Sequence, residues 1–128
     1  MNNQASLAFI AVILVSTPVF SEERHLTKAQ VIEVFTDVTF DGIYLPKNKS
    51  FTAYDAPDGT LVILRANGNK DTGRRWYVND AGQRCATSPK WDEDRCFDVF
   101  DAGNGTYHQY RNGKHLHTLT NFRKGNHL

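Results

Sequence analysis

Alternation of apolar and polar positions dominates the chain after Thr39. Eight short runs rich in β-branched and aromatic residues follow one another, at 39–45, 50–55, 60–66, 74–80, 83–88, 95–101, 106–112 and 114–122. The segments between them, such as "APDG", "NGNKDTG" and "DAGNG", supply residues that initiate turns or adopt positive φ. Seven or eight short strands joined by tight turns predict an antiparallel meander, which forms either a small barrel or a flattened sandwich.

A helical period precedes these strands. Within "LTKAQVIEVF" (26–35), apolar residues including Val31 and Phe35 recur at the spacing of one helix face. Thr27 and Gln30 match the capping box, in which a hydroxyl and an amide satisfy backbone N–H groups reciprocally. The sequence therefore predicts one short N-terminal helix that covers one end or one face of the sheet.

The segment before this helix is apolar and uncharged. Residues 1–21 contain no charged side chain and include an unbroken apolar run at 7–15. That run has the length of the apolar part of a signal peptide and is short for a membrane span. We expect a signal peptide cleaved after Ser21, with an uncleaved anchor as the alternative. Residues 22–128 would then be a single periplasmic or secreted domain with no stable membrane insertion.

The chain holds two cysteines, Cys85 and Cys96. In an oxidising compartment such a pair predicts a disulfide. The spacing is wider than the C-x-x-C of redox motifs, and one pair cannot complete a four-cysteine zinc site. Both cysteines lie in strand-like runs, so we expect a bridge between neighbouring strands.

Several motifs occur in a recognisable order. They are "YDAPDGT", "GRRWYV", the cysteine of "GQRCAT", "KWDEDRC" and a final Gly125-Asn126. This set, which begins near Leu26, resembles the small secreted bacterial family called domain of unknown function 995. In that family the tryptophan follows a glycine closely, whereas two arginines separate Gly73 from Trp76 here. The resemblance implies a periplasmic or secreted single domain with no assigned reaction.

Histidines in a predicted hairpin form the first candidate site. Asn112-Gly113 predicts a two-residue turn that would place His108 opposite His117 and put both on one face with His115. Three imidazoles on one face are a candidate Zn²⁺ or Cu²⁺ site. A one-residue slip would separate them, and no carboxylate lies beside them to orient the rings. An ordinary solvent-exposed hairpin face is therefore the interpretation that we favour.

A basic and aromatic run forms the second candidate site. Arg74, Arg75, Trp76 and Tyr77 could form a lip for an anionic or sugar ligand. The alternative is that Trp76 faces the core, because large aromatic side chains are usually buried.

Motifs for catalysis are missing from the sequence. It contains no G-x-S-x-G, no H-E-x-x-H and no glycine-rich phosphate loop. A formal net charge of +1 gives no strong field for nucleic acid. We expect a non-catalytic binding or inhibitor-type module, without a cofactor, that acts on a protein or cell-envelope component. Zn²⁺ or Cu²⁺ binding through the histidine face is the alternative, and an enzyme of unknown reaction ranks below it.

Overall fold

The computed structural model describes residues 22–128, and the predicted signal peptide, 1–21, lies outside the described residues. Strands dominate the described chain, together with one α-helix and one 3-10 helix. The elements are β1 (Arg24–His25), α1 (Lys28–Phe35), β2 (Val38–Tyr44), the 3-10 helix η1 (Leu45–Lys47), β3 (Lys49–Asp55), β4 (Thr60–Arg65), β5 (Lys70–Val78), β6 (Arg84–Thr87), β7 (Arg95–Gly103), β8 (Thr106–Arg111) and β9 (Lys114–Lys124).

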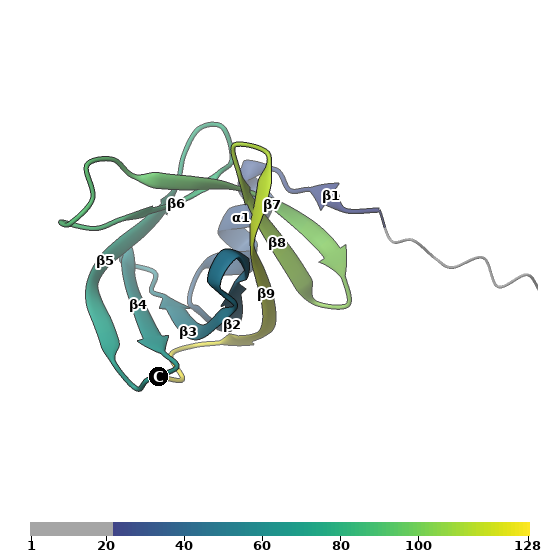
Figure 1. Ribbon diagram of the computed structural model, residues 1–128. Coiled ribbons are helices and arrows are strands. Elements are labelled where there is room, and N and C mark those ends of the chain that lie inside the picture. The colour runs from purple at the N-terminus through teal and green to yellow at the C-terminus, as the bar shows by residue number, and fades with distance from the viewer. Residues whose placement is uncertain (1–21) are drawn as a thin grey trace, which may run out of the picture.

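The strands form a closed antiparallel barrel (Figure 1). Each strand from β2 to β8 pairs with the next, and β9 returns to pair with β2, which completes a ring of eight strands. The predicted meander is confirmed, and it closes as a barrel rather than a sandwich. The sequence did not predict β1, which adds to β7 through the pairs Arg24↔Asp101 and His25↔Phe100.

The helix α1 begins at the predicted capping box. Thr27 Oγ1 accepts a hydrogen bond from the Gln30 backbone N–H at 3.3 Å, and Gln30 Oε1 accepts one from the Thr27 N–H at 2.9 Å. Two of the first free N–H groups of the helix region are thereby satisfied. Val31 and Phe35 are fully buried, so one stripe of this short helix packs into the barrel core.

The helix fills one end of the barrel. The ring of Phe35 meets those of Phe40 and Phe122 edge-on, at centroid distances of 5.4 and 5.5 Å. The turn between β5 and β6 also packs on the start of α1, since a Cβ on Gly82 would lie 3.1 Å from the Lys28 backbone nitrogen. Gly82 also has φ +81°, so glycine suits this position both sterically and conformationally.

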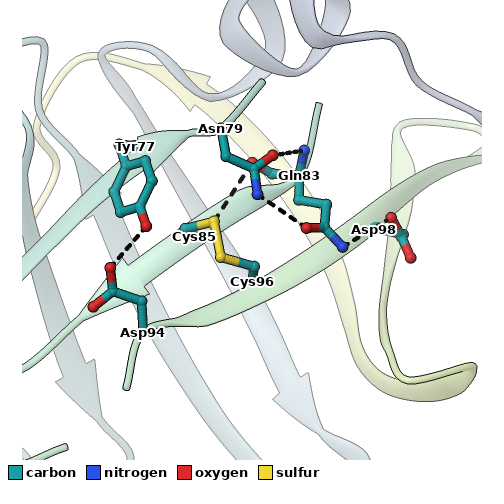
Figure 2. Close-up of a disulfide and its surroundings, with 7 residues drawn as sticks. All are labelled: Tyr77, Asn79, Gln83, Cys85, Asp94, Cys96 and Asp98. Atoms are coloured by element: carbon teal, nitrogen blue, oxygen red, sulfur yellow. Dashed lines mark hydrogen bonds between the residues drawn. A yellow bond between two sulfur atoms is a disulfide. The ribbon is translucent and has the colours of Figure 1, made fainter. Parts of the chain in front are cut away.

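The predicted disulfide is confirmed between Cys85 in β6 and Cys96 in β7. The two residues are direct partners in the antiparallel register of these strands. The bridge therefore joins the two strands at the base of the loop that connects them (Figure 2).

The predicted turn of the last hairpin is confirmed. Asn112 and Gly113 both have positive φ, 52° and 76°, as a two-residue hairpin turn requires. Lys114 pairs with Arg111 and His115 pairs with Tyr110, as the sequence predicts.

The rest of this hairpin has a different register from the predicted one. A β-bulge places one extra residue, Leu116, in β9, so that Gln109 pairs with His117 and His108 pairs with Thr118. The predicted pairing of His108 with His117 is wrong. The bulge shifts the pairing of β9 by one residue. The side chains of β9 that follow Leu116 therefore lie on the face of the sheet opposite to the predicted one.

Candidate ligand-binding site

The barrel contains a cavity of about 800 Å³ at the end opposite α1. Most of its lining comes from the later residues of β2, β4 and β8 and the earlier residues of β3, β7 and β9, and β5, β6 and three connecting segments supply the rest. These segments meet at one end because neighbouring strands of a meander run in opposite directions. A cavity of this volume has the size of a small-molecule site.

Apolar side chains form much of the cavity wall. They are Phe40, Phe51, Ala53, Leu61, Ile63, Ala86 and Phe97. Gly42, the register partner of Phe51 on β2, makes room for the Phe51 ring, because a Cβ on Gly42 would lie 2.3 Å from Phe51 Cζ. The wall therefore provides apolar contact area for a ligand body.

Basic side chains surround the mouth of this cavity. We call this set the cationic rim; it consists of Lys49, Arg65, Arg74, Arg95 and Arg111. Among the described residues, no aspartate or glutamate belongs to the lining. The sequence, with formal net charge +1, does not predict this concentration of positive charge, because net charge says nothing about its distribution.

Carboxylates just outside the lining neutralise part of the rim. Asp71 Oδ2 lies 3.1 Å from Arg65 Nη2 and 3.0 Å from Arg74 Nε. The Arg74 contact is an ion pair without hydrogen-bond geometry, so the buried Nε lacks a hydrogen-bond acceptor. Glu93 pairs with Arg111 at 3.3 Å.

The rim retains an excess of positive charge. Within residues 22–128, Lys49 and Arg95 make no ion pair at all. Burial lowers the pKa of the Arg74 guanidinium; Asp71 opposes this shift, and repulsion from Arg65 and Arg95 adds to it. The mouth is therefore an electropositive, partly desolvated environment that favours an anion.

Trp91 contacts two of the rim arginines. Arg95 Cζ lies 3.9 Å and Arg74 Cζ 4.6 Å from the centroid of its ring, which are cation–π distances. Trp91 is held there by the loop between β6 and β7, whose base is closed by the disulfide. Beside the disulfide, the Tyr77 hydroxyl donates to Asp94 at 2.7 Å (Figure 2).

A chain of hydrogen bonds runs inside the barrel from fully buried Asp55 to partly exposed His117. We call it the floor network; it runs from Asp55 through Arg84 and Gln109 to His117. Asp55, which is 0% exposed, accepts from Arg84 Nε at 2.8 Å and from Arg84 Nη2 at 2.6 Å. Arg84 Nη1 donates to Gln109 Oε1 at 3.2 Å, and Gln109 Nε2 lies 3.2 Å from His117 Nδ1.

Charges within the floor network compensate one another. Burial raises the pKa of Asp55, and the Arg84 guanidinium acts in the opposite direction. Burial, with the nearby charges of Arg84 and His115, lowers the pKa of His117 to about 4. With Asp55 paired to Arg84 and His117 neutral at pH 7, the floor carries no net charge, in contrast to the rim.

The predicted basic and aromatic lip is divided between the two faces of β5. Arg74 lines the cavity. Trp76 lies in the core, 8% exposed, and its Nε1 donates to the Ala56 carbonyl at 2.8 Å. Arg75 donates to the Asp58 carbonyl at 2.8 Å, away from the cavity, and Tyr77 lies beside the disulfide. Successive side chains of a strand point to opposite faces, so these four residues do not share one surface. Arg74 is the one of the four that lines the cavity.

The three predicted metal ligands are also divided. His117 lines the cavity, whereas His108 and His115 lie on the outer face, with their rings 4.1 Å apart and tilted by 35°. On that face Glu23 contacts His108 Nδ1 and accepts from Tyr110 at 2.9 Å. Over residues 22–128 no three His, Cys, Asp or Glu side chains are grouped as metal ligands.

Most residues of the cavity lining and of the floor network carried no motif in the sequence. Arg84 in the lining and Asp55 behind it occupy inward positions of strand-like runs, where a charged residue within an apolar pattern is the signal that the sequence offers. Trp91 and Arg95 belong to the disulfide loop and its flank, and only the folded barrel brings them next to Arg74.

Comparison of the chain with protein-family models, with curated proteins and with solved structures finds no match. Among the described residues, no helix has both the length and the apolar character needed to cross a membrane.

Proposed function

We propose that this domain binds a small anionic ligand with an apolar body in the open end of its barrel. The observation that carries this proposal is the cavity of about 800 Å³, with its basic rim, its aromatic and aliphatic wall and no carboxylate among its described lining residues. The rim would bind a carboxylate, phosphate or sulfonate, and the wall would bury the rest of the ligand.

This proposal narrows the predicted binding module to a small-molecule binder. The basic and aromatic side chains converge on a concave space rather than on a flat or protruding surface, and concavity is typical of small-molecule sites. Among cell-envelope components, amphiphiles with one anionic group have the required chemistry. The predicted leader and the disulfide support a periplasmic or secreted location for this binding.

Binding is favoured over catalysis by the chemistry of the lining. Its described residues include no carboxylate and no cysteine, and the pKa of His117 is lowered to about 4. A general acid or base works best with a pKa near the operating pH, and a histidine shifted this far does not meet that condition.

A matched pair of fluorescent probes tests the proposal. Anilinonaphthalene sulfonate and N-phenylnaphthylamine share one aromatic body, and only the first carries a negative charge. We expect saturable binding of both at one site, with the sulfonate about tenfold tighter because it gains charge-assisted hydrogen bonds at the rim. Added salt should reduce this preference, because the rim is open to solvent.

Two arginine variants locate the site. Arg95→Gln removes one of the two rim charges that have no ion pair, and it should lower the preference for the sulfonate. Arg24→Gln removes an arginine of β1 that pairs with Asp101 outside the barrel, and it should leave both affinities unchanged. Equal losses in the two variants, or no saturable binding of either probe, would contradict the proposal.

A further inference from the structure

The donors and acceptors of the floor network can be assigned from its two charged members. Asp55 is fully buried and directly paired to a guanidinium, so its carboxylate only accepts hydrogen bonds. Arg84 only donates hydrogen bonds. The oxygen of the Gln109 side chain must therefore face Arg84, and its NH₂ group must face His117.

This order determines the tautomer of His117. Because Gln109 Nε2 is a donor, His117 Nδ1 must accept, and in a neutral imidazole the proton then resides on Nε2. Within residues 22–128, His117 Nε2 has no hydrogen-bond partner. This atom is not completely enclosed, since Arg74 Nε is the one described polar side-chain atom that is both fully buried and without a hydrogen bond. His117 thus offers a free N–H donor to the cavity that it lines.

The surroundings of this donor are aromatic. The rings of Phe97 and Phe51 meet the His117 ring edge-on, with centroids 5.1 and 5.9 Å away, and Tyr44 lies at 5.4 Å. A ligand that displaced water from this N–H without accepting a hydrogen bond would leave a buried donor unsatisfied, which is unfavourable.

We infer that the ligand carries, at the end that enters the barrel, an uncharged hydrogen-bond acceptor such as a hydroxyl, carbonyl or ether oxygen, which binds His117 Nε2–H. This inference rests on the proposed function and defines the ligand class further. An anionic group at that end is disfavoured because Asp55 already compensates Arg84, whereas the rim holds the unpaired charges of Lys49 and Arg95. The ligand would therefore bind with its anionic group at the cationic rim and its neutral acceptor at His117.

Competition against anilinonaphthalene sulfonate by three classes of acid tests this orientation. The first class is the even-numbered fatty acids from octanoate to dodecanoate, the second their ω-hydroxy derivatives, and the third the corresponding dicarboxylates. At the chain length that spans the distance from the rim to His117, we expect the ω-hydroxy acid to bind roughly tenfold more tightly than the other two classes. In a purely apolar cavity the added hydroxyl would instead weaken binding.

Two histidine variants assign the preference to one atom. His117→Phe removes the donor and keeps an aromatic ring, so it should abolish the advantage of the ω-hydroxy acid. His115→Phe is the matched control on the outer face and should retain the advantage. An independent measurement on the unaltered protein is the ¹⁵N spectrum of His117, which should show a neutral, Nε2-protonated ring at pH 7.

The outcomes separate the inference from the proposed function. If fatty acids compete but no hydroxyl advantage appears, or if the dicarboxylates bind best, the inference is overturned and the binding function stands. A spectrum with the proton on Nδ1, or with a charged ring, overturns it without any ligand. If no acid competes with the probe, the proposed function fails and the inference fails with it.

Discussion

Removal of Arg84 should destabilise the barrel more than removal of any exposed cation. The Asp55 carboxylate is 0% exposed and receives two of the three hydrogen bonds that Arg84 makes with the floor network. Arg84→Met would leave a buried carboxylate and the Gln109 oxygen without donors. Breaking a buried pair from one side costs about 3 to 5 kcal/mol, a large part of the stability of a small domain.

Urea unfolding of the oxidised protein, followed by circular dichroism at pH 7, measures this cost. Arg24→Met is the matched control, because Arg24 is 77% exposed in its pair with Asp101 and such pairs contribute about 1 kcal/mol or less. The double variant Asp55→Leu with Arg84→Met should recover part of the loss, since it removes both charges from the interior.

The pH dependence of Arg84→Met provides a second measurement. Burial raises the pKa of Asp55, and without the opposing guanidinium the folded variant binds a proton more readily than the unfolded chain. The loss of stability should therefore shrink as the pH falls from 7 towards 4.5. A loss below about 1 kcal/mol at pH 7, equal to that of Arg24→Met, would refute the burial of this pair as the source of the effect.

Two further predictions concern the disulfide and His117. Replacement of Cys85 and Cys96 by serine should lower the free energy of unfolding by about 3 kcal/mol, mainly because the open loop gains freedom in the unfolded chain; equal urea midpoints would contradict this. His117 has a pKa of about 4 when folded against an ordinary 6.5, so the unfolded chain binds the proton more tightly. The free energy of unfolding should therefore fall by about 3 kcal/mol between pH 6.5 and 4. His117→Gln should flatten this dependence on pH, whereas His115→Gln should retain most of it. Parallel plots of unfolding free energy against pH for the original chain and His117→Gln would exclude this assignment.

Local sequence signals predicted much of the fold. The capping box of Thr27 and Gln30, the Asn112-Gly113 turn and the Cys85–Cys96 bridge each depend on neighbouring residues or on one pairing. Such features leave a direct trace in the sequence because their chemistry is local. The meander itself was predicted from the strand-like runs after Thr39 and the turn segments between them.

The candidate site was much less predictable. The bulge at Leu116 has no sequence signal, since both faces of the predicted hairpin mix apolar and polar residues. Without that bulge, His117 would join His108 on the outer face, as the sequence analysis expected. The cationic rim assembles from five different strands, β3, β4, β5, β7 and β8, so its side chains come together only when these strands have paired.

Closure of the ring also imposes an order on folding during synthesis. Most neighbouring strands are joined by short turns, but β2 pairs with β9, and Thr39 Oγ1 donates to the Gly125 carbonyl 86 residues away. A contact of such long sequence separation forms late and carries a larger loop-closure cost. The ribosome makes β2 before any other strand of the ring and β9 last. The free edge of β2 is thus the part of the nascent barrel that a chaperone would protect, and an aggregation partner would occupy.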